Sequence, residues 1–303
     1  MKVPEAFAEA TIRREGPPGR AWIDGLPGLV DTMLREWELT VDGDVLHGHV
    51  AVVLPVRRAE GDRAVLKVAW PDEYTRREPL GLRAWNGRGG VLLLREDVGR
   101  GAFLLERLRP AVTLEHRPMR EALEAAADVL RLLHAAVPPD GVPHVAEEVT
   151  PAVEGISRTP TGRPRWQTSI LGPAVDTLLG AGSAEGESVL LHGDYHYANV
   201  LASDTGEWRA IDPKPCVGPR EYDLLPMLRN RWTELPAGDP GRGLRDRLRT
   251  LVERVGHDFD RAAEWCRARA VMDALAAEGN DDHDFAALSW TIAREVVAPS
   301  SRR

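Results

Sequence analysis

The sequence predicts an α+β fold, with a small antiparallel β-sheet in its first third and a mainly helical remainder. Residues 50–56 (VAVVLPV) and 64–70 (AVLKVAW) are rich in β-branched and apolar side chains, and a turn at residues 59–62 separates them. This is the pattern of a β-hairpin. Residues 119–134 instead repeat apolar side chains at helical spacing. Strand signals therefore gather in the first third of the chain, and helix signals dominate after it.

The same patterns place the remaining elements. Two separate helices are expected at residues 4–11 and 25–37, and a second hairpin at 90–94 and 101–105. Prolines punctuate residues 138–164, so a loop-rich segment is expected there. Beyond it we expect helices at 167–179, 244–255, 261–277 and 285–297, and short strands at 189–191, 200–202 and 208–211.

Composition limits the classes of function. The chain has 303 residues, 43% hydrophobic and 28% charged, as in an ordinary globular protein with a sizeable core. Its net charge of −8 disfavours a nucleic-acid partner. Most of the excess negative charge lies after residue 106. That acidity suits a cationic small-molecule ligand, and it equally suits solubility.

Cysteine usage and hydropathy predict the compartment. Cys216 and Cys266 form neither a metal-binding spacing nor a disulfide framework. The chain shows no signal-peptide pattern and no uninterrupted apolar run of about 18 residues. We therefore expect a cytoplasmic protein without a membrane partner, present as a monomer or weak dimer.

The stretch LHGDYHYANVLASDTGEWRAID carries three polar residues at an informative spacing: Asp194, Asn199 and Asp212. A phosphoryl-transfer site needs a carboxylate that orients a hydroxyl nucleophile, and oxygen ligands that hold magnesium on phosphates. A hairpin between Asn199 and Asp212 is expected to bring these two residues together. Each residue alone would be a turn former, and His192 and His196 would be structural. Only the combination favours this chemistry.

Lys67 is the second informative residue, because it interrupts an apolar strand. Within residues 64–70 it shares one face with Val65 and Ala69. A lysine in such a strand must reach water or meet an anion. Two interpretations stay open on the sequence: a lysine at a sheet edge that extends its charge to solvent, or a lysine that binds an anion.

The pattern HGDxxxxN followed by ID resembles the aminoglycoside phosphotransferase family, which shares the protein-kinase fold. The segments VVLPVRRAEGDRAVLKVAWP, EPLGLRAWNGRG and LLLERLRP resemble its streptomycin 6-phosphotransferase and hydroxyurea phosphotransferase branch. The resemblance covers most of residues 35–228. It implies a bilobal α+β fold, with a nucleotide-binding lobe at 1–105, a hinge at 106–108, and a catalytic and acceptor-binding lobe at 109–303.

The resemblance also implies two cofactors, ATP and Mg²⁺, and roles for the polar residues. Asp194 would orient the acceptor hydroxyl and take its proton late. Asn199 and Asp212 would bind magnesium, and Lys67 would bind the α- and β-phosphates of ATP.

The resemblance implies that Lys67 has a glutamate partner on the next helix, and Glu78 is the candidate. A local alternative exists, because Thr75 and Glu78 have the spacing of a capping box. Glu73 is the alternative partner for the lysine.

The nucleotide contacts are less readable. The backbone of Glu106 and Leu108 would bond the adenine edge in a hinge of this kind. The loop that would cover the phosphates contains Gly43 and Gly48 but no GxGxxG pattern, so Gly48 is its only candidate and is otherwise a turn residue.

Several residues depart from the protein-kinase pattern. Gly193 stands where protein kinases usually have arginine, Pro213 follows Asp212, and no APE segment follows. These differences favour a small-molecule kinase. Lys214 is either a phosphate ligand or a surface cation, and Asp223 is expected to brace the start of a helix.

We therefore expect ATP-dependent phosphorylation of a hydroxyl on a streptomycin-like aminoglycoside, a cationic acceptor. One alternative is a kinase of hydroxyurea or another small metabolite. The alternative from another class is a catalytically silent nucleotide-binding protein that regulates a partner.

Overall fold

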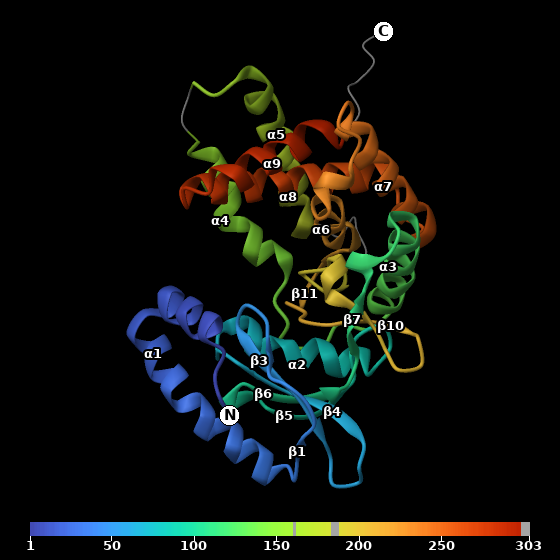
Figure 1. The fold of residues 1–303 in the computed structure, drawn as a ribbon. Coiled ribbons are helices and arrows are strands. Elements are labelled where there is room, and N and C mark those ends of the chain that lie inside the picture. Colours follow the sequence, from blue (N-terminus) through green and yellow to red (C-terminus); the bar gives the residue numbers. More distant parts are fainter. Residues whose placement is uncertain (160–161, 183–187, 298–303) are drawn as a thin grey trace.

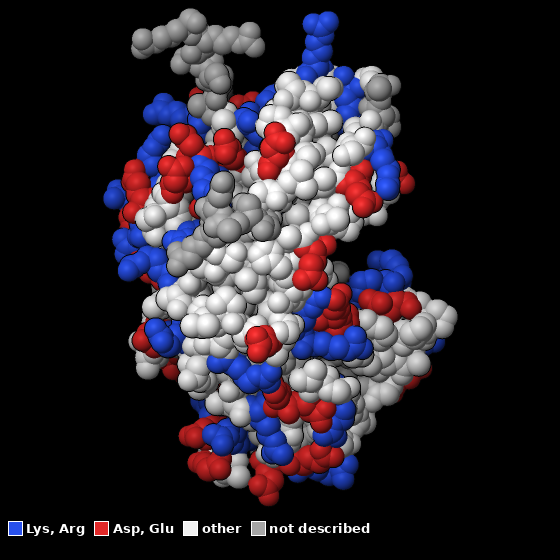
Figure 2. Space-filling model, turned by 180° about the vertical axis from the view of Figure 1, so that it is seen from behind, with Lys and Arg blue, Asp and Glu red and all other residues white. Residues whose placement is uncertain are grey.

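The computed structural model describes residues 1–159, 162–182 and 188–297, and it has two lobes (Figure 1). The first lobe contains a sheet flanked by helices, and the second is mainly helical. The α+β bilobal architecture predicted from the sequence is confirmed. On the face shown in Figure 2, basic and acidic side chains are intermixed over both lobes.

An antiparallel sheet forms the centre of the first lobe. Its strands run in the order β1-β3-β4-β6-β5, with β2 also paired to β3. Lys67 lies in β4 between Val53 and Phe103 of the neighbouring strands, so it is central and not at an edge. The strands are β1 (Thr40–Val41), β2 (Leu46–His47), β3 (Ala51–Arg57), β4 (Arg63–Ala69), β5 (Leu93–Asp97) and β6 (Ala102–Glu106).

Helix α1 (Glu5–Glu36) covers one face of this sheet (Figure 1). The prediction of two separate helices was wrong, because the chain continues as one bent helix whose break is a single residue, Gly16 (φ 66°, ψ −140°). Pro17 and Pro18 begin the second limb, where a missing N–H and a fixed φ are tolerated. The buried contacts of this face include Leu26, Val30 and Met33 of α1 and Leu54, Leu66 and Leu104 of the sheet.

Helix α2 (Glu73–Trp85) follows β4 and lies against the opposite face. Leu82 and Trp85 share a buried cluster with Phe103 and Leu105, whose side chains alternate with that of Leu104 along β6. This cluster continues into the second lobe, so the two lobes share apolar packing behind the site.

The second lobe packs helices around two short sheets. One sheet has the order β10-β9-β7, and the other pairs β11 with β8. The strands are β7 (Arg109–Thr113), β8 (Ser188–Leu191), β9 (Val200–Ala202), β10 (Trp208–Ala210) and β11 (Cys216–Pro219). The helices are α3 (Met119–His134), α4 (Val145–Ser157), α5 (Arg165–Leu179), α6 (Leu225–Arg229), α7 (Pro240–Val255), α8 (Phe259–Gly279) and α9 (His283–Glu295).

Helix α4 corrects the expectation of a loop-rich segment at residues 138–164. His144 caps it by accepting a hydrogen bond from the Ala146 N–H, and Glu147 completes a capping box. Pro151 lies inside the helix. The segment also includes Pro160 and Thr161, which lie outside the described residues.

Within residues 1–159, 162–182 and 188–297, no helix has the length and hydrophobicity needed to span a bilayer. Cys216 and Cys266 are both buried and both free.

Candidate active site

Strand β8 leads into the loop that carries His192, Gly193 and Asp194. The fully buried carboxylate of Asp223 accepts hydrogen bonds from the backbone N–H of His192 and of Gly193, both at 2.8 Å. Its Oδ2 also lies 3.1 Å from Nε2 of His134. Asp223 therefore braces the loop that presents Asp194. The expected bracing of a helix start was wrong, because α6 begins at Leu225 without a side-chain cap.

Gly193 is fixed by a close approach of the chain after Asp212. It adopts φ +80°, and a Cβ at this position would lie 2.1 Å from the carbonyl oxygen of Lys214. The Lys214 N–H in turn donates to the His192 carbonyl at 2.8 Å. No side chain fits here, which accounts for glycine where protein kinases usually have arginine.

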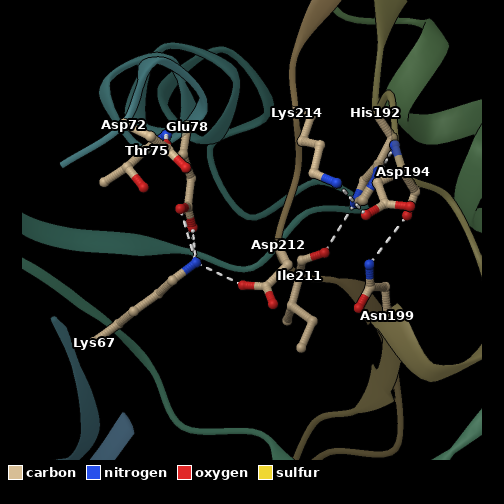
Figure 3. A network of polar contacts seen from close by, with 10 residues as sticks. All are labelled: Lys67, Asp72, Thr75, Glu78, His192, Asp194, Asn199, Ile211, Asp212 and Lys214. Atoms are coloured by element: carbon tan, nitrogen blue, oxygen red, sulfur yellow. Dashed lines mark hydrogen bonds and ion pairs between the residues drawn. The ribbon is translucent and has the colours of Figure 1, made fainter. Parts of the chain in front are cut away.

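A hairpin brings Asn199 and Asp212 together, as expected. Strands β9 and β10 pair antiparallel, and the Ile211 N–H donates to the Asn199 carbonyl at 2.9 Å. The Asn199 amide nitrogen donates to the Asp194 carbonyl at 3.0 Å, so its side chain fixes the connection between β8 and β9 that carries both residues (Figure 3). Asp212 itself adopts a positive φ of 54°, an uncommon conformation that turns the chain directly after the strand.

Lys67 reaches across from the first lobe to this hairpin. Its Nζ donates to Glu78 Oε1 and Oε2 at 2.8 and 2.7 Å, and to Asp212 Oδ1 at 2.5 Å (Figure 3). The capping-box alternative is not observed, because Asp72 caps α2 by accepting from the Thr75 N–H at 2.7 Å. The other alternative partner, Glu73, pairs with Arg77.

Neighbouring charges shift the pKa values of Lys67, Asp212 and Asp194. Burial acts to lower the pKa of Lys67, but the carboxylates of Asp212 and Glu78 outweigh it and raise that pKa above its ordinary value. The Lys67 ammonium lowers the pKa of Asp212. For Asp194, burial acts to raise the pKa, and Lys214 more than compensates, so the net pKa is lowered. Asp194 and Asp212 are therefore anionic at neutral pH, whereas burial raises the pKa of Glu78.

An apolar cavity of about 250 Å³ lies beside Lys67 and Asp212. Glu106, Arg107 and Leu108 line one end. The side chain of Glu106 accepts from the Leu92 N–H at 2.8 Å and so turns to a structural partner. The remaining wall comes from both lobes and includes Leu46, His47, Gly48, Val53, Pro55, Val65, Val91, Leu105, Pro110, Leu201 and Ile211.

A second, more polar cavity of about 500 Å³ shares Lys67, Asp212 and Gly48 with the first. It extends to Asp194 and Asn199. Lys67 and Asp212 therefore lie where the two cavities join, and Asp194 and Asn199 line the second cavity with them. Further lining residues are Arg14, Glu15, His49, Val50, Asp72, Tyr74, Thr75, Glu78, His196, Pro213 and Lys214.

The family described as aminoglycoside/hydroxyurea antibiotic resistance kinase matches residues 36–281, most of the chain. The chain belongs to this family. The streptomycin 6-kinase of Streptomyces griseus is 40% identical over 287 residues, which cover 91% of this chain and 90% of that protein. The hydroxyurea phosphotransferase of Kitasatospora aureofaciens is 37% identical over 280 residues, which cover 91% of this chain and 80% of that protein.

Solved structures show the same fold at low sequence identity. A thermostable mutant of the aminoglycoside phosphotransferase APH(4)-Ia, in ternary complex with AMP-PNP and hygromycin B, superposes with a TM-score of 0.59 and 15% identity, covering 89% of this chain and 99% of that one. The family predicted from HGDxxxxN and ID is thus confirmed, and so is the class of enzyme, a small-molecule phosphotransferase.

Sequence reasoning left open or missed several residues of this antibiotic resistance kinase. Lys214, left between phosphate ligand and surface cation, donates from Nζ to Asp194 Oδ2 at 2.9 Å and lies 5.6 Å from the Tyr74 ring centre. The structural interpretation of His192 is supported by its hydrogen bond to the Ile211 carbonyl at 3.0 Å. Arg14 was not singled out, because nothing in a helical pattern signals contact with a distant loop.

Proposed function

We propose that this kinase transfers the terminal phosphoryl group of ATP to a hydroxyl of a streptomycin-like aminoglycoside. The observation that carries the proposal is that Lys67, Asp212, Asn199 and Asp194 line one polar cavity, which adjoins the apolar cavity at Lys67 and Asp212. Phosphoryl transfer depends on positioning and on charge stabilisation. An ammonium group, an amide and two carboxylates in one cleft supply both.

In this proposal the 250 Å³ cavity holds the adenine and ribose. Residues 106–108 act as the hinge between lobes 1–105 and 109–303, with backbone groups of Glu106 and Leu108 on the adenine edge. The support is that both residues line the apolar cavity, while the Glu106 side chain is held by Leu92. Gly48 would sit over the phosphates, since a Cβ there would lie 3.9 Å from Asp212 Oδ2.

Magnesium fits the residues present. Mg²⁺ is typically held by one or two protein oxygens together with substrate phosphates and water. The half-exposed Asp212 carboxylate offers Oδ2 beside the oxygen that binds Lys67, and Asn199 is oriented through its amide nitrogen, so its oxygen is the ligand atom. The ion would neutralise phosphate charge during transfer.

Asp194 is the proposed base. It accepts a hydrogen bond from the acceptor hydroxyl, whose oxygen forms the new P–O bond while the bond to the β–γ bridging oxygen of ATP breaks and ADP departs. The hydroxyl proton passes to Asp194 late in the reaction. The lowered pKa of Asp194 keeps it ready to accept hydrogen bonds.

The acceptor assignment rests on the relatives. Two are named for different acceptors, streptomycin and hydroxyurea, so hydroxyurea is the second candidate. The net charge of −8 suits the cationic aminoglycoside, as it also suits solubility. Because the reaction consumes cytoplasmic ATP, we place the enzyme in the cytoplasm, and we propose a monomer or weak dimer.

An acceptor panel tests the proposal. ATP consumption would be followed with streptomycin, other aminoglycosides, hydroxyurea and small hydroxylated metabolites, and mass spectrometry would locate the new phosphate. We expect turnover with streptomycin and a phosphate ester on one of its hydroxyls. Turnover with hydroxyurea alone would support the second candidate. ATP binding without transfer to any acceptor would contradict both and favour a silent nucleotide-binding protein.

A further inference from the structure

The first limb of α1, residues 5–15, packs on the tip of the β2–β3 hairpin. Phe7 is buried, with 2% of its surface exposed. Its ring lies 5.6 Å from the ring of His47, at the end of β2, and 6.0 Å from Trp22 of the second limb. Apolar contacts thus hold the limb between the hairpin and the rest of α1.

Arg14 adds a polar tie to the same hairpin. Its Nη1 donates to the carbonyl oxygen of His49 at 3.1 Å. His49 follows Gly48 in the turn, and the Gly48 N–H closes that turn by donating to the Ala51 carbonyl at 2.9 Å. Arg14 therefore contacts the backbone of the turn that lies beside Asp212.

The bend at Gly16 makes this contact possible. A φ of 66° with ψ −140° is disfavoured for residues that carry a Cβ. It redirects the first limb, while the second limb keeps Leu26 and Val30 buried on the sheet. The family match begins at residue 36, so the limb lies outside the matched region although it lines the catalytic cleft.

We propose that residues 5–15 form a clamp that fixes the turn at 48–50 over the nucleotide phosphates, with Arg14 as a positioning residue. The proposal rests on the proposed ATP site. The turn lacks a GxGxxG sequence. Contacts with residues 5–15 hold its backbone in one conformation instead. A turn ordered before ATP arrives costs less conformational entropy on binding.

Arg14 acts through the carbonyl and not through its charge. Its Nε donates to Glu15 Oε1 at 2.6 Å, so a carboxylate beside it offsets the guanidinium charge. If Arg14 instead neutralised phosphate charge, removing the Glu15 carboxylate would make ATP bind more tightly. This difference separates the two roles experimentally.

The test compares R14A, R14K and E15Q with R13A, the exposed neighbouring arginine, as the matched control. Steady-state kinetics would give kcat and both KM values, and hydrogen exchange would report the amides at 48–51. In R14A we expect the KM for ATP to rise by up to about tenfold, the upper end of what one hydrogen bond to a carbonyl contributes. The KM for the acceptor should change less than twofold, and the turn amides should exchange faster. R14K should recover part of the loss, and R13A should match the parent enzyme.

Three outcomes would overturn the clamp. The first is an R14A variant in which hydrogen exchange at the turn amides and the KM for ATP are both unchanged. The second is an equal rise in the KM values for ATP and for the acceptor. The third is an E15Q variant that binds ATP more tightly, which would assign Arg14 a charge role. If R14A does not fold, R14K and E15Q carry the same comparison. Failure of the proposed function is distinguishable, because the parent enzyme would then transfer no phosphate to any acceptor.

Discussion

Replacement of Asp223 by asparagine tests how the catalytic loop is held. The buried carboxylate accepts from two backbone N–H groups, of His192 and Gly193, at 2.8 Å each. Asparagine keeps one acceptor oxygen and places an NH₂ group against the other donor. A buried donor left without a partner costs ~1–3 kcal/mol, which corresponds to a fall in Tm of ~2–5 °C for a chain of 303 residues.

Activity should fall as well, because the loop carries Asp194. A displacement of a catalytic group by ~1 Å can lower turnover by ~100-fold. Thermal unfolding and ATP-consumption assays measure the two effects. Asp128→Asn is the control, since Asp128 pairs with Arg254 on the surface, where an ion pair contributes under ~1 kcal/mol. A D223N enzyme with the parent Tm and kcat would refute the bracing role.

Three further predictions follow from the same geometry. Gly193→Ala should abolish turnover, because its Cβ would meet the Lys214 carbonyl at 2.1 Å; full activity would contradict the close approach. Glu78→Gln should weaken ATP binding and destabilise the fold by ~1–3 kcal/mol, since it removes a buried carboxylate that accepts from Lys67 while Asp212 still pairs with that lysine; chemical denaturation and nucleotide titration measure both. Lys214→Met removes a cation that lowers the pKa of Asp194, so that pKa should rise. The acidic limb of the pH profile of kcat/KM should then move to higher pH, and an unmoved limb would exclude Asp194 as the titrating base.

The sequence predicted the site best where local patterns determine geometry. Period-two alternation put Lys67 on the same face of its strand as Val65, and both residues line the first cavity. A turn between two short strands placed Asn199 beside Asp212. These relations depend on neighbours in the chain, which a single sequence displays. The spacing of Asp194, Asn199 and Asp212 then indicated a phosphoryl-transfer site.

Other features depend on contacts between distant segments. The tie between Arg14 and His49 joins residues of different elements, and no periodicity encodes it. Asp223 looked like a helix-start residue because α6 begins two residues later, yet its partners lie on the loop after β8. Helix α4 was missed because its cap is His144 and Pro151 lies inside it, so tertiary packing overrode the local signals.

The central claim is that Asp194 receives the proton of an acceptor hydroxyl in a site that binds ATP through other residues. Asp194→Asn preserves the side-chain volume and the backbone carbonyl that Asn199 contacts. The most direct measurement combines ATP titration with single-turnover transfer to streptomycin in this variant. ATP affinity should stay within about threefold of the parent, while the transfer rate falls by ~10²–10⁴-fold. Parent-like transfer by the D194N enzyme would contradict the account.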